Sequence, residues 1–158
     1  MTVLCVDDSS DDTVLLRHAC RRAGVQFALQ AVDDGDKAIQ YLTGGDVFSD
    51  RNAYPVPRLI LLDLKMPSKT GFEVLAWLRK HPIHGKLPVA VFTSSQHESD
   101  IHEAYRKGAN CFLTKPVEYE ALVELVKALD QSVTSTEGFP GPLLKLDAFK
   151  PEPGSARA

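Results

Sequence analysis

The most informative stretch of the chain reads Leu59-Ile60-Leu61-Leu62-Asp63-Leu64-Lys65-Met66-Pro67. It is an apolar run that ends in an acidic residue and is followed by a proline. Three other segments are also apolar runs that end at a reactive group: residues 3–6 before Asp7 and Asp8, residues 89–92 before Thr93, and residues 111–114 before Lys115. Short apolar runs of this kind are typical of buried parallel strands.

Helical patterns alternate strictly with these runs. The expected strands cover residues 2–7, 27–32, 58–63, 88–93 and 110–114. The expected helices are a first one capped by residues 9–12 and ended by Gly24, then 36–42, one ended by Pro82, 98–107 and 118–133. Five β-α units in this order predict an α/β fold, a doubly wound five-stranded parallel sheet with helices on both faces.

Length and composition predict one domain with an extension. The domain is expected at residues 1–134, and residues 135–158, which hold four of the ten prolines, form the proline-rich extension. That extension is either solvated or docked through its apolar residues against the body or a second subunit. The polar stretch 44–57 is a long loop, for which tolerated surface is favoured over a binding feature.

Charge and hydropathy exclude several classes of function. The net charge of −3 gives no electrostatic footprint for nucleic acid or an anionic membrane. No apolar stretch approaches the length of a membrane helix, and the start does not resemble a signal peptide, so a cytoplasmic protein is expected. The odd number of cysteines and their spacing favour small buried hydrophobic residues over disulfides or a zinc site.

The polar groups after the strands should meet at one edge, because parallel strands share the edge at which their carboxyl ends lie. Asp7, Asp8 and Asp63 offer hard oxygen ligands suited to Mg²⁺. Beside such a cation the Asp63 carboxylate can attack phosphorus and form an aspartyl phosphate. Thr93 can hydrogen-bond a phosphoryl oxygen, and Lys115 can neutralise its charge.

Each residue also has a plainer interpretation. Asp8 could be a helix cap, Asp63 a turn residue and Lys115 a solvated lysine. A phosphatase with an aspartyl nucleophile would need an acid two residues after it, where this chain has Lys65. A nucleotide-binding module would need a glycine-rich loop after the first strand, and acidic residues stand there instead.

Together these motifs resemble the receiver domain of two-component response regulators over residues 2–133. The acid pair Asp7-Asp8, the segment 63–67 with Gly71, Thr93, and Lys115-Pro116 carry the resemblance. It implies the flavodoxin- or CheY-like strand order 2-1-3-4-5. It also implies that Asp63 is the phosphoacceptor, that Asp8, Asp63 and the Lys65 carbonyl hold Mg²⁺ with Asp7 assisting through water, and that Thr93 and Lys115 sense the phosphoryl group.

Finer features resemble the small regulators that serve phytochrome-type sensor kinases. There are departures from the family pattern. Phe112 stands where the family's switch aromatic is often Tyr; it is expected to turn inward when Thr93 moves. Lys65 replaces a frequent Asn and is expected to add positive charge near the site. Residues 130–133 stand where such regulators often carry an aromatic pair.

The resemblance also implies partners. A sensor histidine kinase donates the phosphoryl group, and a histidine phosphotransfer protein or another protein receives the signal. A homodimer through the face of the fourth helix, fifth strand and fifth helix is expected. The chain is expected not to be an enzyme, beyond autophosphatase activity at most, and to bind neither nucleic acid nor membrane.

Overall fold

The computed structural model describes residues 1–135, and its centre is a five-stranded parallel sheet in the order β2-β1-β3-β4-β5. The strands are β1 (Thr2–Val6), β2 (Ala28–Val32), β3 (Leu59–Leu62), β4 (Val89–Thr93) and β5 (Cys111–Thr114). Each strand pairs in parallel with its neighbours. The predicted fold class and strand order are confirmed.

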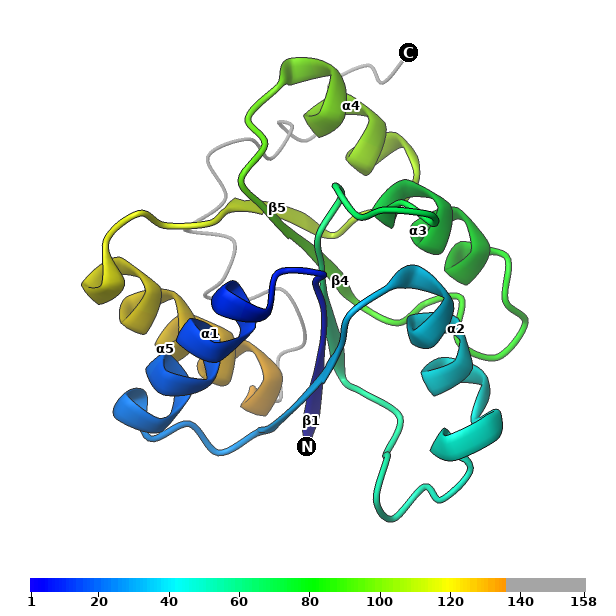
Figure 1. Ribbon diagram of the computed structural model, residues 1–158, viewed down its shortest axis with the longest axis horizontal. Coiled ribbons are helices and arrows are strands. Elements are labelled where there is room, and N and C mark those ends of the chain that lie inside the picture. Colours follow the sequence, from blue (N-terminus) through cyan, green and yellow to red (C-terminus); the bar gives the residue numbers. More distant parts are fainter. Residues whose placement is uncertain (136–158) are drawn as a thin grey trace.

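Helices cover both faces of this sheet (Figure 1). On one face lie α1 (Ser10–Ala23) and α5 (Tyr119–Thr134), which pack on each other. On the other face lie α2 (Gly35–Thr43), α3 (Gly71–Arg79) and α4 (Glu98–Arg106). The sheet is therefore doubly wound, as the alternation of strands and helices predicts.

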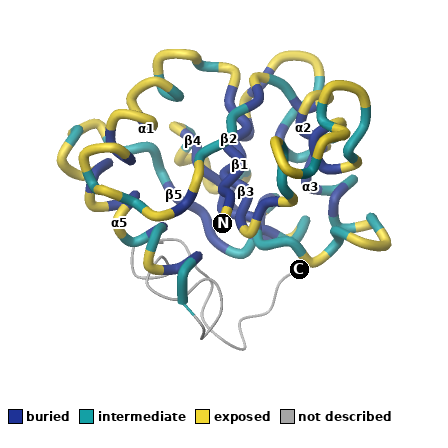
Figure 2. The backbone as a smooth tube through the Cα atoms, turned by 90° about the horizontal axis from the view of Figure 1, so that it is seen from below, coloured by how far each residue is buried: buried dark blue, intermediate teal, exposed yellow. Residues whose placement is uncertain are grey.

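Each strand feeds two hydrophobic cores, because successive side chains in a strand point to opposite faces. In β1, Leu4 and Val6 join the core under α2, α3 and α4, whereas Val3 and Cys5 join the core under α1 and α5. Figure 2 shows buried strands in the middle and exposed residues along the outer sides of the helices. Cys5, Cys20 and Cys111 are buried among the apolar residues of the core, which confirms their interpretation as small hydrophobic residues.

The segment 44–57 lies at the surface, as its sequence favours, since residues 44–56 are exposed or only partly buried, but a few of its side chains pack against α2. It contains a short 3-10 helix (Asp46–Phe48), and the rings of Phe48 and Tyr54 contact Tyr41 with centroids 5.2 and 5.9 Å away. The Arg51 guanidinium donates to the carbonyls of Tyr41 and Leu42, both at 2.8 Å. These bonds satisfy carbonyls that the end of α2 leaves without helical partners. This packing is hard to predict from the polar composition of the segment, because only a few of its residues take part in it.

Two further predictions concern membrane-spanning helices and the proline-rich extension. No helix within residues 1–135 has the length and apolarity needed to cross a bilayer. The proline-rich extension lies, apart from Ser135, outside the described residues, and so does the prediction that it docks.

Candidate metal and phosphoryl site

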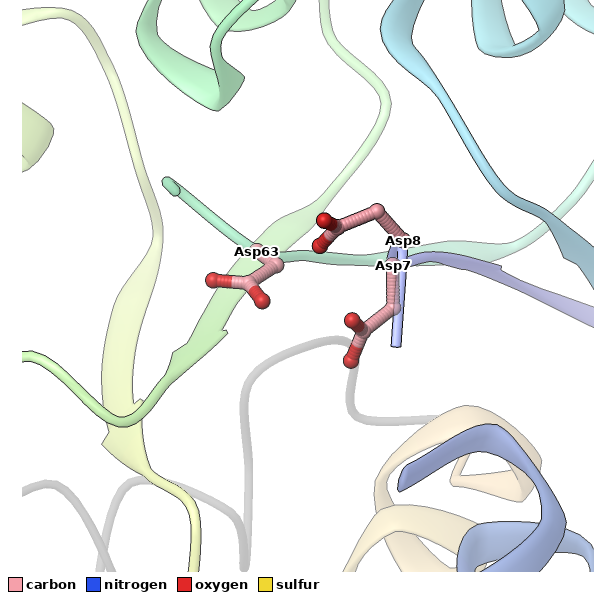
Figure 3. Close-up of side chains that lie close together, drawn as sticks. All are labelled: Asp7, Asp8 and Asp63. Carbon is pink, nitrogen blue, oxygen red and sulfur yellow. The ribbon is translucent and has the colours of Figure 1, made fainter. Parts of the chain in front are cut away.

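Three carboxylates converge where β1 and β3 end. Each of Asp7, Asp8 and Asp63 places an oxygen within 4.8 Å of the others (Figure 3). The convergence follows from the register, since Val6 lies beside Leu62 and the next residue of each strand continues the pairing. Asp7 and Asp63 are buried, whereas Asp8 is exposed. Oxygen ligands from three acids fit a hard divalent cation.

Backbone amides hold the two buried carboxylates in place. The Ser9 amide donates to Asp7 Oδ1 at 2.9 Å, and the Lys65 amide donates to Asp63 Oδ1 at 3.3 Å. The Asp63 amide itself donates to the Val6 carbonyl at 3.0 Å and so keeps the two strand ends together. The carboxylates are therefore oriented by the loops that follow each strand.

Gly71 brings α3 against the same strand end. A Cβ at this position would lie 2.2 Å from the Asp63 carbonyl oxygen, so no other residue fits without moving backbone. The Gly71 amide donates to the Leu64 carbonyl at 3.2 Å. Thr70 and Glu73 complete a capping box at the start of α3. This close approach fixes the loop between β3 and α3.

Lys115 is the cation of the site. Its Nζ lies 2.6 Å from Asp7 Oδ2, 2.8 Å from Asp12 Oδ2 and 3.0 Å from Asp63 Oδ2. Only 11% of its side chain is exposed. The ammonium thus bridges the ends of β1, β3 and β5 and the start of α1.

The acids outnumber this lysine, and the pKa shifts express the imbalance. Burial raises the pKa of Asp7 above its usual value, and the hydrogen bond from Lys115 offsets this only in part. Burial acts to lower the pKa of Lys115, but the hydrogen bonds to Asp12 and Asp7 and the charge of Asp63 outweigh it, so the pKa is raised. A divalent cation would relieve the excess of negative charge.

Sequence reasoning missed Asp12 as a site residue. It was read as one of several helix-capping acids in the first turn of α1, and its amide does donate to Ser9 Oγ at 3.2 Å. Its carboxylate, however, reaches Lys115, which is 103 positions away in the chain. The available signal was the position of Asp12 in the first turn of the helix that begins at the edge where the strands end.

Thr93 and Phe112 are both buried near the strand ends. Thr93 Oγ1 accepts a hydrogen bond from the Ser95 amide at 3.4 Å, and its carbonyl accepts from the Lys115 amide at 2.8 Å. Phe112 is fully buried in the core under α2, α3 and α4. The expected turn of Phe112 from outside to inside therefore does not start from this conformation, in which the ring is already inward.

The positive charge of Lys65 is paired with an acid on α4. Its Nζ lies 3.0 Å from Asp100 Oδ2 on α4, and that same oxygen accepts from Ser95 Oγ at 2.6 Å. The Lys65 side chain is 60% exposed. Its ammonium is thus paired with α4, and the proposed metal ligand, its backbone carbonyl, stays a prediction.

Comparison with known proteins places this geometry in a family. The profile of the response regulator receiver domain matches residues 3–127. The response regulator Rcp1 of Synechocystis sp. is 32% identical over 138 residues, which cover 87% of this chain and 92% of that protein.

Solved structures agree. The response regulator RPA3017 in red light signaling of R. palustris matches with a TM-score of 0.77 at 34% identity, covering 82% of this chain and 91% of that one. The Mn²⁺-bound form of Rcp1 matches with a TM-score of 0.74 at 32% identity, covering 88% and 98%. Rcp1 thus binds a divalent ion, and this chain gathers three acids that fit one. On its fold, its acidic edge and these matches, the chain belongs to the response regulator receiver domain family.

Proposed function

We propose that this chain is a phosphorylation-controlled switch of a two-component pathway. In this proposal Asp63 accepts a phosphoryl group from a histidine of a sensor kinase while Mg²⁺ is bound. The observation that carries the proposal is the cluster of Asp7, Asp8 and Asp63 with the Lys115 ammonium against two of its members. Phosphoryl transfer needs positioning and charge neutralisation above all, and this cluster offers both.

The chemistry assigns a step to each residue. An Asp63 carboxylate oxygen attacks phosphorus as the bond from phosphorus to the kinase imidazole nitrogen breaks, and the imidazole leaves with the bonding electron pair. Mg²⁺ bound by Asp7, Asp8, Asp63 and the Lys65 carbonyl would supply charge neutralisation for the phosphoryl oxygens. Lys115 would bind one of those oxygens, and the Thr93 hydroxyl would donate to another.

An apolar surface beside the acids supports docking of the kinase. Val14 and Leu15 on α1 are 52% and 48% exposed, and Val117 after β5 is 98% exposed. The bond between Lys115 and Asp12 ties the loop that carries Val117 to the start of α1. Exposed apolar residues around a charged site are typical of a protein contact. We propose that the helices of the kinase dock here.

The class of kinase follows from the relatives. Rcp1 is close to this chain in sequence, RcpA is described as a cyanobacterial phytochrome response regulator, and RPA3017 acts in red light signaling. We therefore propose a sensor kinase of the phytochrome class. We propose that the exchange takes place in the cytoplasm, where an ATP-dependent kinase has its nucleotide.

The proposed output is a protein contact. Within this chain the receiver accounts for residues 3–127, so the changed face of α4, β5 and α5 would carry the signal to a histidine phosphotransfer protein or another partner, or pair with a second copy of this chain. The proposal treats the chain as a phosphoacceptor and not as an enzyme, because Lys65 stands where an aspartyl phosphatase has its general acid. The proposed function includes no binding to nucleic acid or to a membrane.

The first experiment is phosphorylation with a small donor. The protein is incubated with Mg²⁺ and acetyl phosphate and weighed intact by mass spectrometry. We expect the mass of one phosphoryl group on the wild type, none on Asp63→Asn, and none after chelation. Asp50→Asn, which changes an exposed aspartate of the 44–57 loop, is the matched control and should be labelled like the wild type.

Two results would contradict the proposal. One is an unlabelled wild type under conditions that label another receiver domain. The other is equal labelling of Asp63→Asn, which would move the acceptor to a different residue.

A further inference from the structure

Asp12 differs from the other acids that contact Lys115. The three carboxylates that gather as a cation cluster are Asp7, Asp8 and Asp63, and Asp12 lies outside that cluster. Its Oδ2 nevertheless lies 2.8 Å from Lys115 Nζ, as close as the bonds to Asp7 and Asp63. The lysine thus has one partner on α1 that the cation does not need.

The other two partners are shared. Asp7 and Asp63 each use their Oδ2 atom for Lys115, and each uses Oδ1 to accept from a backbone amide. A cation held by these carboxylates must therefore compete with the ammonium for their Oδ2 atoms. Like charges repel strongly at such distances in a partly buried site. Binding of the cation requires that the ammonium be stabilised elsewhere.

We propose that Asp12 is a positioning residue that draws Lys115 toward the α1 side of the site, so that the ammonium can give up its contacts with Asp7 and Asp63 when a cation binds and still stay beside the phosphoacceptor. The proposal rests on the function proposed above, since it assumes a cation at the cluster and a phosphoryl group at Asp63. Asp12 touches neither of them itself. Its side chain is 40% exposed, so it can keep its charge at little desolvation cost while it pairs with the more deeply buried lysine.

The structure also gives the reason why Asp12 stays in place. Its residue is fixed in the first turn of α1, where its amide donates to Ser9 Oγ and where a negative charge is favoured by the helix dipole. Because Asp12 is fixed and the Lys115 side chain is flexible, Asp12 determines where the ammonium lies. Without Asp12, Lys115 retains only Asp7 and Asp63, and it would settle between them, against the cation.

The test is a double-mutant cycle on cation affinity. Mg²⁺ is titrated into the unphosphorylated full chain and followed by amide NMR shifts, for the wild type, Asp12→Asn, Lys115→Met and the double variant. We expect Asp12→Asn to weaken Mg²⁺ binding by about three- to tenfold when Lys115 is present. In the Lys115→Met background the same change should alter the affinity less than about twofold.

The matched control is Asp11→Asn. Asp11 is an exposed acid in the same first turn, so its removal changes the helix end by the same charge. We expect less than about a twofold effect from it. Asp12→Glu keeps the charge within reach of Lys115 and should recover most of the affinity. The rate of labelling by acetyl phosphate at saturating Mg²⁺ should fall for Asp12→Asn and recover for Asp12→Glu.

Several outcomes would overturn the proposal. Equal weakening by Asp12→Asn with and without Lys115 would mean that Asp12 acts only as a nearby charge. An effect of Asp11→Asn as large as that of Asp12→Asn would mean the same. If Asp12→Asn left the affinity for Mg²⁺ unchanged, Lys115 would not need Asp12 to position its ammonium. A wild type that binds no Mg²⁺ at all would instead overturn the proposed function, so the two failures are distinguishable.

Discussion

Two cations of this protein, Lys115 and Arg79, lie at opposite edges of the same sheet and are held in different ways. Lys115 follows β5 at the carboxyl edge, and its partners are the carboxylates of Asp7, Asp12 and Asp63. Arg79 ends α3 near the amino ends of β4 and β5, and its main partners are the carbonyls of Gly85, Leu87 and Gly108, at 2.7 to 3.1 Å.

The difference in partners distinguishes a cation in the candidate site, Lys115, from a cation with a structural role, Arg79. Carboxylates can exchange one cation for another, so the partners of Lys115 can also bind a metal or carry a phosphoryl group. The carbonyls around Arg79 are neutral and fixed by the backbone, and Asn110 Oδ1 joins them at 3.0 Å. Burial lowers the pKa of Arg79. Arg79 therefore ties loops together, whereas Lys115 lies among groups that are proposed to carry out chemistry.

Replacing Arg79 should have the largest effect on stability. Arg79→Met leaves several carbonyls of the loops before β4 and β5 without their donors, and we expect a loss of about 2–4 kcal/mol in the free energy of unfolding. Urea denaturation measures it. Saturating Mg²⁺ should not close the gap between the variant and the wild type, because the two edges are separate.

The matched control for this variant is Arg106→Met. Arg106 pairs with Glu103 on the exposed side of α4, and we expect a change below about 0.5 kcal/mol. A loss below about 1 kcal/mol for Arg79→Met would contradict a structural role for the arginine.

Replacing Lys115 should have a smaller effect that the cation reverses. In the metal-free protein, Lys115→Met leaves Asp7 and Asp63 buried without a counterion, and we expect a loss of about 1–2 kcal/mol. Mg²⁺ should bind this variant more tightly, since no ammonium competes for the carboxylates, and should therefore stabilise it more than the wild type. Urea denaturation with and without Mg²⁺ measures both; equal stabilisation by Mg²⁺ would mean that the lysine does not compete.

The sequence predicts the carboxyl edge well because each of its main residues directly follows an apolar strand. That local pattern is enough to place Asp7, Asp63, Thr93 and Lys115 at one edge once the sheet is parallel. The same logic gives the ranges of β1, β3, β4 and β5, because a strand buried on both faces leaves a continuous apolar run.

The sequence does not reveal contacts that depend on the reach of a long side chain. Arg79 looks like an ordinary basic residue in the last turn of a helix, and its bonds go to carbonyls, which carry no sequence signature. Asp12 looks like a helix-capping acid, and Lys65 looks like part of the site until its bond to Asp100 is seen. Only the three-dimensional arrangement of loops decides these partners.

Burial should make the charged form of Asp7 costly at neutral pH, and the nearby charge of Asp63 adds to this cost. Its folded pKa is raised, so the folded protein binds more protons than the unfolded chain between the usual aspartate pKa of 3.8 and the raised value. Stability is therefore lost as the pH rises through this window. In the metal-free protein, Asp7→Asn should be more stable than the wild type at pH 7.

This gain should fade as the pH falls toward the unfolded pKa, where both states are protonated. Thermal unfolding between pH 3.5 and pH 7, roughly the window set by the aspartate titration, measures it. Saturating Mg²⁺ should reduce or reverse the gain, because the ion stabilises the wild type through Asp7. If Asp7→Asn is less stable than the wild type at pH 7 without metal, the bond to Lys115 outweighs the cost of burial.

The smallest effect is expected where the carboxyl edge meets α4. Asp100 has 13% of its side chain exposed, and its pKa is held below the usual value first by the hydrogen bond from Ser95 and then by Lys65, whose side chain is 60% exposed. Lys65→Gln should change the free energy of unfolding by less than about 0.5 kcal/mol. NMR titration of the Asp100 carboxyl should show a larger rise in its pKa for Ser95→Ala than for Lys65→Gln.

The opposite order would mean that the lysine is the main anchor of Asp100. In that case the loop after Asp63 would be tied to α4 by charge, and the link should weaken with salt. In the order expected here, the tie between β4 and α4 is a short hydrogen bond from Ser95, in the loop after β4, to Asp100 in the first turn of α4, and Lys65 adds an exposed charge to it. The acidic edge would then keep Lys115 as its main internal cation, and the competition between Lys115 and the metal would govern the site.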